Sequence, residues 1–215
     1  MKAVIFDLDG TLLYSIDTIA YYCNLTLKDL GYKPLDKSDY LKLINFGAHD
    51  LISGMLKKVG SNADSSEVFD HYMSLYSKSP CHLSYPYAGV CEMLIELRNR
   101  GVKTAILSNK PDNLVQNISK NIFNGMLNIS YGQRGQYPTK PDPSSLLALI
   151  DELGCKTDKV LYAGDSGVDM QCGKNAGVFT VGVGWGFFGT KPFDNADLIV
   201  NKPMEIVEYI DKNSF

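Results

Sequence analysis

The chain has 215 residues, of which 45% are hydrophobic and 21% charged, and its 21 basic and 24 acidic side chains give a formal net charge of −3. This composition is typical of a folded globular protein and excludes disordered, collagen-like and coiled-coil chains. The lysines are scattered rather than clustered and no run of 18 apolar residues occurs, so we expect neither a nucleic-acid partner nor a membrane span.

The cysteine pattern predicts free thiols in a reducing compartment. The five cysteines are odd in number, widely separated and without a CxxC pair, which indicates neither a disulfide framework nor a zinc site: Cys23, Cys81, Cys91, Cys155 and Cys172. At the N-terminus only residues 3–6 are apolar before Asp7, which is too short for an export signal. We therefore expect the protein to work in the cytoplasm.

Short runs rich in β-branched and apolar residues predict strands. The first covers residues 2–6, and the others cover 102–107, 128–131, 160–163, 178–183 and 198–200. Several are continuously apolar, as is typical of strands covered on both faces of a parallel sheet. Helical patterns lie between and after them, over 90–100, from 144 to Gly154 and over 203–209. This alternation predicts an α/β fold with a doubly wound, Rossmann-like parallel sheet.

One segment breaks the alternation. Residues 15–82 show helical periodicity and no convincing strand, and about 68 residues are far more than a usual crossover needs. We therefore expect an all-helical cap domain at 15–82, inserted into an α/β core formed by residues 1–14 and 83–215. The stretch 84–89, which contains Pro86 and Gly89, predicts a hinge at the exit of the insert.

The first predicted strand ends in two aspartates, Asp7 and Asp9. Two carboxylates so close repel each other unless a cation lies between them or one holds a proton. A simple turn at Asp9 and Gly10 is the structural alternative. However, ligands of open α/β sheets bind beyond the carboxyl ends of the strands, where this pair lies, so its position favours a functional site.

Three more polar clusters follow predicted strands: residues 108–110, 140–143 and 164–169. Each alone could be a turn or a helix cap, since Ser108 and Asp165 are good N-cap residues. Four clusters at one rim of the sheet instead predict phosphoryl transfer, because carboxylates hold Mg²⁺ while a hydroxyl and an ammonium bind phosphate oxygens. Asp7 and Asp165 suit the metal, and Asp9 is placed to move a proton to and from the reacting oxygens.

In their order and spacing these motifs resemble the haloacid dehalogenase (HAD) superfamily. The residues that carry the resemblance are Asp7-Leu-Asp9-Gly-Thr11, Ser108-Asn109, Lys140-Pro141 and Gly164-Asp165-Ser166-Gly-Val-Asp169, with a helical insert after the first motif. The sequence is more narrowly similar to the phosphoglycolate phosphatase-like branch with a helical cap. The resemblance covers essentially the whole chain, and it implies a Mg²⁺-dependent phosphatase that acts on a small phosphorylated metabolite.

The resemblance also implies roles for the acidic residues. Asp7 would be the nucleophile that forms an aspartyl-phosphate and would bind Mg²⁺. Asp9 would be the general acid and base and would give its backbone carbonyl to the metal. Asp165 would be the third metal ligand, and Asp169 would orient the waters of the metal without binding it directly.

Other positions would bind phosphate or select the substrate. The resemblance implies that Ser108 and Lys140 bind the transferring phosphoryl group, with Asn109 at the margin of the phosphate site. Gly47 lies in a loop similar to the specificity loop of phosphoglycolate phosphatases, and its freedom at positive φ would let main-chain amides approach the substrate. His49 and Arg134 are candidates to meet a substrate anion, since the predicted cap contains no arginine.

The acid at Asp9 favours ester hydrolysis, because an alkoxide that leaves at neutral pH needs a proton whereas a halide does not. Three alternatives stay open at this point. The same scaffold could carry a phosphomutase similar to β-phosphoglucomutase or an inorganic pyrophosphatase, or the chain could be a non-catalytic sensor of a phosphorylated metabolite. Either a monomer or a homodimer fits the sequence.

Overall fold

The computed structural model describes residues 2–191 and 193–213, so residue 1, residue 192 and the last two positions of the predicted core lie outside the described part of the chain. A six-stranded parallel sheet is its centre, in the order β5-β4-β1-β6-β7-β8. The strands are β1 (Ala3–Phe6), β4 (Lys103–Pro111), β5 (Ile129–Gln133), β6 (Val160–Gly164), β7 (Phe179–Val183) and β8 (Leu198–Val200). The predicted doubly wound α/β fold is confirmed.

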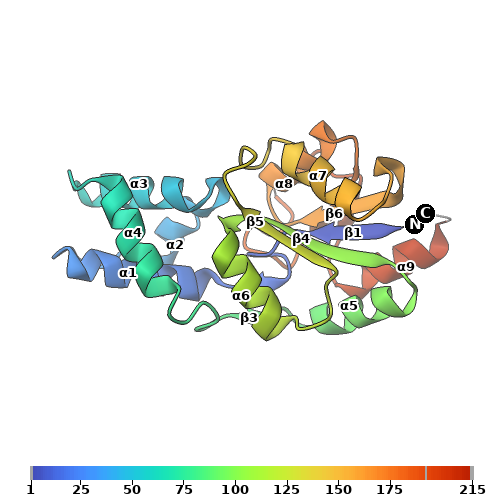
Figure 1. Cartoon of the computed structure of the whole chain (residues 1–215), viewed down its shortest axis with the longest axis horizontal. Helices are drawn as coiled ribbons and strands as arrows, with labels where there is room; N and C mark the ends of the chain where they lie inside the picture. The colour runs from blue at the N-terminus through green and yellow to red at the C-terminus, as the bar shows by residue number, and fades with distance from the viewer. Residues whose placement is uncertain (1, 192, 214–215) are drawn as a thin grey trace.

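Side chains point alternately to the two faces of the sheet along each strand, so both faces carry apolar residues that helices cover. In β1, Val4 and Phe6 point into one buried cluster, whereas Ala3 and Ile5 point into another on the opposite face. The first face is covered by α5 (Val90–Asn99), α6 (Asp112–Ile122) and α9 (Met204–Lys212), and the second by α7 (Ser144–Glu152) and α8 (Gly167–Asn175). Figure 1 shows these helices in two layers about the sheet. A short 3₁₀ helix, η2 (Thr157–Lys159), precedes β6.

The strand β4 is longer than predicted. It extends to Pro111, so residues 108–110 lie within the strand rather than beyond its end. Its register against β5 shifts between Leu107 and Pro111. A local hydrogen bond accompanies this irregularity, since the Lys110 amide donates to the Ser108 hydroxyl (3.2 Å). The polar side chains of this segment still lie at the carboxyl edge of the sheet.

The segment predicted to be helical contains α1 (Ile16–Asp29), α2 (Lys37–Tyr40), η1 (Ile44–Phe46), α3 (Ala48–Val59) and α4 (Ser65–Tyr76). These helices surround their own buried cluster, and Figure 1 shows them together at one end of the molecule. Leu114 of α6 also belongs to this cluster, and Phe187 packs against it. The helices therefore rest directly on the edge of the sheet where the polar motifs lie.

Two very short strands flank the helical segment. β2 (Leu13–Tyr14) pairs antiparallel with β3 (Tyr85–Pro86), and the Tyr14 and Tyr85 rings stack with their centroids 5.0 Å apart. Strands of two residues are too short to show periodicity, so the sequence did not predict this pair. The points at which the chain enters and leaves the helical segment are thus joined, at the place where the hinge was expected.

The described residues include no helix that is both long enough and apolar enough to cross a membrane. All five cysteines are free; Cys23 and Cys172 are buried, and Cys81, Cys91 and Cys155 are partly exposed.

Candidate active site

A pocket lies at the carboxyl edge of the sheet, and we call it the carboxylate pocket. Its polar lining comes from every motif that the sequence singled out: Asp7, Asp9, Ser108, Asn109, Lys140, Asp165 and Asp169. Asp7 follows β1 and Asp165 follows β6, which are neighbouring strands, while Lys140 comes from the connection between β5 and α7. Residues more than 130 positions apart in the sequence, such as Asp7 and Lys140, are brought into hydrogen-bonding contact.

Lys140 is the centre of a buried ionic network. Its ammonium lies 2.8 Å from Asp7 Oδ1 and 2.7 Å from Asp169 Oδ1, and it also donates to the Leu107 carbonyl at 3.3 Å. Burial alone would lower the pKa of Lys140, but the carboxylates of Asp169 and Asp7 outweigh burial and hold that pKa above its usual range. The ammonium therefore stays charged beside the carboxylate of Asp7.

The buried acids outnumber this single cation. Asp7, Asp165 and Asp169 each offer an oxygen atom within 4.8 Å of the others. Burial raises the pKa of Asp7 to about 7, and burial together with the charge of Asp7 raises the pKa of Asp165 well above its usual range. A divalent cation would remove this repulsion, and Mg²⁺ prefers oxygen ligands, usually one or two carboxylates together with water and substrate oxygens. The residues present therefore fit the predicted metal.

Asp169 differs from the other two acids because both of its oxygens are already engaged. Oδ1 accepts hydrogen bonds from Lys140 and from the Tyr162 hydroxyl (2.9 Å), and Oδ2 accepts from the amide and hydroxyl of Ser166 (3.2 and 2.6 Å). Ser166 in turn caps α8 in a capping box with Asp169, so the cap is Ser166 and not Asp165. The bonds that hold Asp7 and Asp165 engage one oxygen of each, which leaves them better suited to bind a metal.

Asp9 lies outside the cluster of three acids and has its own partners. The ammonium of Lys110 lies 3.1 and 3.0 Å from the two carboxylate oxygens of Asp9, and Ser15 donates to Oδ1 at 2.5 Å. Sequence reasoning assigned no role to Lys110, although it is buried and directly contacts the predicted acid and base. The alternation of a strand was the available signal, because it directs Lys110 to the same side as Ser108.

Asn109 holds the loop of Lys140 in place. Its side-chain oxygen accepts from the Lys140 amide (2.8 Å), and its side-chain nitrogen donates to the carbonyls of Lys140 and Asn45 (3.2 Å each). The carboxamide thus connects β4, the Lys140 loop and the helical segment. These bonds give Asn109 a positioning function in addition to its place in the lining of the pocket.

The loop of residues 184–189 also packs on the site. The Phe187 amide donates to Asp165 Oδ2 (2.8 Å), and the indole of Trp185 donates to the Thr11 carbonyl (2.9 Å). Gly186 permits this approach, because a Cβ there would lie 2.3 Å from Asp165 Cβ and 2.5 Å from the Gly10 carbonyl oxygen. The aromatic residues of this loop are therefore next to the site, and its backbone orients Asp165.

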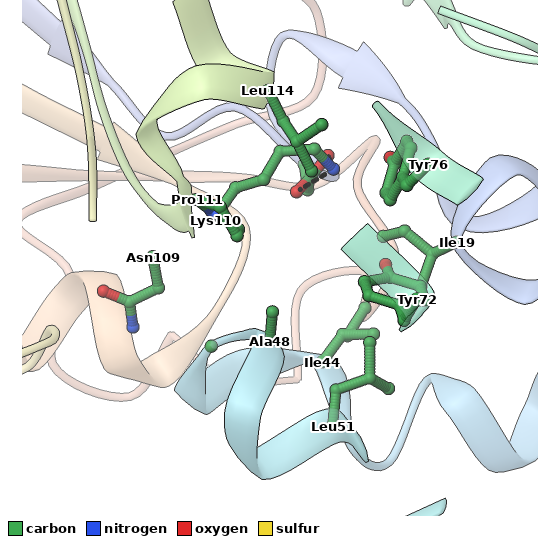
Figure 2. A pocket seen from close by; sticks show the side chains of 12 residues that line it. Ile19, Ile44, Ala48, Leu51, Tyr72, Tyr76, Asn109, Lys110, Pro111 and Leu114 are labelled. Carbon is green, nitrogen blue, oxygen red and sulfur yellow. Dashed lines mark hydrogen bonds and ion pairs between the residues drawn. The ribbon is translucent and has the colours of Figure 1, made fainter. Parts of the chain in front are cut away.

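The three positions predicted to select the substrate do not all line the site. Gly47, at φ 106°, lines a second pocket next to Asp9, which Figure 2 shows. His49 lines neither this pocket nor the carboxylate pocket, and its ring is stacked on that of Phe69 with a centroid distance of 3.7 Å. Arg134 also lies outside both linings, where it bonds to Asp112 (2.9 Å). Of the three, only Gly47 is brought to the site.

The model of the haloacid dehalogenase-like hydrolase family matches residues 4–183. The chain belongs to this family. It is 28% identical to the N-acetylmuramic acid 6-phosphate phosphatase of Pseudomonas aeruginosa, over 99% of this chain and 96% of that protein. It is 30% identical to a phosphoglycolate phosphatase of Vibrio parahaemolyticus, over 98% of this chain and 96% of that protein.

A solved structure agrees with this assignment. A protein of Haemophilus somnus, described as a predicted phosphoglycolate phosphatase, superposes with a TM-score of 0.89 at 25% identity, over 97% of each chain. The predicted membership of the HAD superfamily and of its phosphoglycolate phosphatase-like branch is confirmed, as is the prediction of an enzyme of the phosphoric monoester hydrolase class.

Proposed function

We propose that this HAD enzyme is a Mg²⁺-dependent phosphatase that hydrolyses a small phosphorylated metabolite through an aspartyl-phosphate on Asp7. The observation that carries the proposal is the contact of Asp7 with the buried ammonium of Lys140 at 2.8 Å, among acids whose charges call for a metal. The cytoplasmic location expected from the free cysteines belongs to the same proposal. Monomer and homodimer both remain compatible with it.

The chemistry proceeds in two steps. A carboxylate oxygen of Asp7 attacks phosphorus, the bond between phosphorus and the ester oxygen breaks, and Asp9 in its acid form protonates the departing oxygen. A water molecule then gives a proton to the Asp9 carboxylate and attacks phosphorus, which releases phosphate and restores the carboxylate of Asp7. Lys110 and Ser15 hold the carboxyl group of Asp9 in position for both transfers.

The phosphoryl group is placed by Ser108 and Lys140. Both line the carboxylate pocket, and a hydroxyl and an ammonium are suited to the charge on the transferring oxygens. Asp7, Asp165 and the backbone carbonyl of Asp9 would hold Mg²⁺, which when bound supplies further positive charge to the phosphate oxygens. Asp169 would support this arrangement by fixing Lys140 and Ser166.

The helical segment 15–82 would act as a cap over this site. Ile44 and Asn45 of this segment line the carboxylate pocket together with residues of the sheet edge, and Asn109 bonds to Asn45. A cap in this place keeps bulk water away during transfer and contacts the alcohol part of the substrate. The relatives named above, an N-acetylmuramic acid 6-phosphate phosphatase and a phosphoglycolate phosphatase, support a small substrate of this kind.

The experiment that tests the function is phosphate release from a panel of small phosphate esters and pyrophosphate, with Mg²⁺ or EDTA. We expect release from a few esters, dependent on Mg²⁺ and absent in Asp7→Asn. Asp158→Asn is a matched control, since Asp158 is exposed in η2 and lines neither pocket. Release that survives in Asp7→Asn, or that Mg²⁺ does not affect, would contradict the proposal.

A further inference from the structure

A second pocket opens beside Asp9 and lies between the helical segment and the start of α6; we call it the inner pocket. It shares Asp9, Ile44, Asn109 and Lys110 with the carboxylate pocket, so the two are neighbours. Figure 2 shows Tyr72 and Tyr76 on one side and Lys110 with Leu114 on the other. An ester whose phosphate occupies the carboxylate pocket would therefore extend its alcohol part past Asp9 into the inner pocket.

We infer that the inner pocket accepts an uncharged, hydroxyl-bearing alcohol, such as a polyol or a sugar, and discriminates against an alcohol that carries a carboxylate. This inference rests on the proposed function and specifies its substrate class. The names of the phosphoglycolate phosphatase relatives would instead suggest a substrate whose alcohol part carries a carboxylate. Three properties of the pocket carry it.

The first property is a buried hydroxyl whose hydrogen-bonding capacity is not filled. Tyr76 is 1% exposed and lines the inner pocket, where it contacts the Lys110 ammonium and has no other polar partner for its hydroxyl among the described residues. A buried hydroxyl that is not fully satisfied is costly, and native structures rarely retain one. A hydroxyl of the substrate is a suitable partner, because it can donate to and accept from a phenol.

The second property is the charge balance of the lining. Lys110 is the one cationic residue among the described residues that line the inner pocket, and its ammonium already contacts both oxygens of Asp9. A substrate carboxylate would therefore enter next to Asp9 and compete with it for one ammonium. Burial of an unpaired charge is strongly unfavourable, whereas a hydroxyl enters without that penalty. Arg134 and His49, which could have supplied positive charge, do not line this pocket.

The third property is the apolar part of the lining. Ile19, Leu51 and Leu114 surround the pocket together with the ring of Tyr72. A polyol or sugar presents C–H groups as well as hydroxyls, so it can contact such a surface while its hydroxyls bond elsewhere. A planar carboxylate on a two-carbon alcohol offers almost no C–H surface for these side chains.

The test compares substrates that differ only in a carboxylate or a hydroxymethyl group. One pair is phosphoglycolate and hydroxyethyl phosphate, and the other is phosphoglycerate and glycerol phosphate, both phosphorylated on a terminal carbon. We expect kcat/KM to be at least about tenfold higher for the hydroxymethyl member of each pair. Equal values, or a preference for the carboxylate, would overturn the inference and leave the phosphatase function intact.

The proposed function and the inference fail in different ways. If p-nitrophenyl phosphate and all four esters release no phosphate with Mg²⁺, the phosphatase function fails and the inference fails with it. If p-nitrophenyl phosphate is hydrolysed but neither hydroxymethyl ester is, only the inference is refuted.

A Tyr76 variant tests whether the buried tyrosine hydroxyl causes the preference for hydroxyl-bearing esters. Tyr76→Phe should lower kcat/KM for glycerol phosphate by about fivefold to tenfold, mainly through KM, and should lower it less for ethyl phosphate, which has no free hydroxyl. Tyr209→Phe is the matched control. Tyr209 lies in α9 and stacks on Phe179 of β7, outside both pockets, so its replacement should change neither value. Equal losses for both esters in Tyr76→Phe would contradict a bond between Tyr76 and the substrate.

Discussion

Replacement of Lys140 by methionine tests the ionic network that underlies the site. The variant keeps most of the side-chain volume but removes an ammonium that lies 2.8 Å from Asp7 and 2.7 Å from Asp169. All three side chains are largely buried, and Lys140 is 5% exposed. Without the cation, the carboxylates face one another and Asp165 in a site from which water is mostly excluded.

The expected loss of stability is large for a single substitution. Removal of one partner from a buried ion pair costs about 3–5 kcal/mol, because the remaining charge is left uncompensated. For a chain of this size, each kcal/mol lowers Tm by about 2–4 °C, so we expect Tm to fall by about 6–20 °C. Uptake of a proton by Asp7, whose pKa burial raises to about 7, would bring the loss toward the lower end of this range.

The assay is urea unfolding at neutral pH in EDTA, so that a metal ion does not contribute. Lys212→Met is the matched control, since it removes the same charge from an exposed pair in which Lys212 lies 3.6 Å from Glu208. Exposed pairs of this kind contribute about 0.5 kcal/mol or less. A loss below about 1 kcal/mol in Lys140→Met would refute the view that this ammonium compensates the buried acids.

Three further predictions concern the surroundings of the site. Gly186→Ala should lower kcat/KM about a hundredfold, because its Cβ would displace Asp165 or the Gly10 backbone, and an unchanged value would show that the loop does not orient the metal site. Asn109→Ala should lower kcat by about tenfold or more, since the lysine loop loses two bonds and the helical segment one; equal kcat in variant and wild type would contradict this positioning role. Mg²⁺ at about a hundredfold excess over its Kd should stabilise the EDTA-treated protein by about 2.7 kcal/mol in thermal unfolding. Asp165→Asn should lose most of this gain, and a gain that persists in the variant would place the metal elsewhere.

Sequence reasoning succeeded where local pattern and topology were enough. Continuous apolar runs predicted the strands, and the rule that parallel strands present their carboxyl ends at one edge brought Asp7, Lys140 and Asp165 together correctly. The helical segment was also predicted, because its amphipathic periodicity continues over several helices with their own buried cluster.

The pattern could not reveal contacts that depend on the rotamer of one side chain or on a distant loop. Lys110 was part of a recognised motif, yet its bond to Asp9 spans 101 positions of sequence. The bond from the Phe187 amide to Asp165 is a backbone contact, which no side-chain motif can encode. Both features belong to the positioning of the site rather than to its reacting groups.

Two of the predicted substrate contacts lie outside both pockets, for a physical reason. His49 and Arg134 were chosen by charge, but each has a nearby partner, the ring of Phe69 and the carboxylate of Asp112. These partners hold the two side chains away from the inner pocket. Whether a charged residue meets substrate is decided by such competition, which composition alone does not show.

Acid quenching of a single turnover tests the central claim, that Asp7 attacks phosphorus, most directly. The wild-type enzyme is mixed with Mg²⁺ and a phosphate ester labelled in its phosphoryl group, and the protein is examined for bound label. We predict a phosphoprotein that hydroxylamine cleaves, as expected of an acyl phosphate, and none in Asp7→Asn. Rapid phosphate release without labelled protein at any quench time, or the same label in Asp7→Asn, would contradict the account.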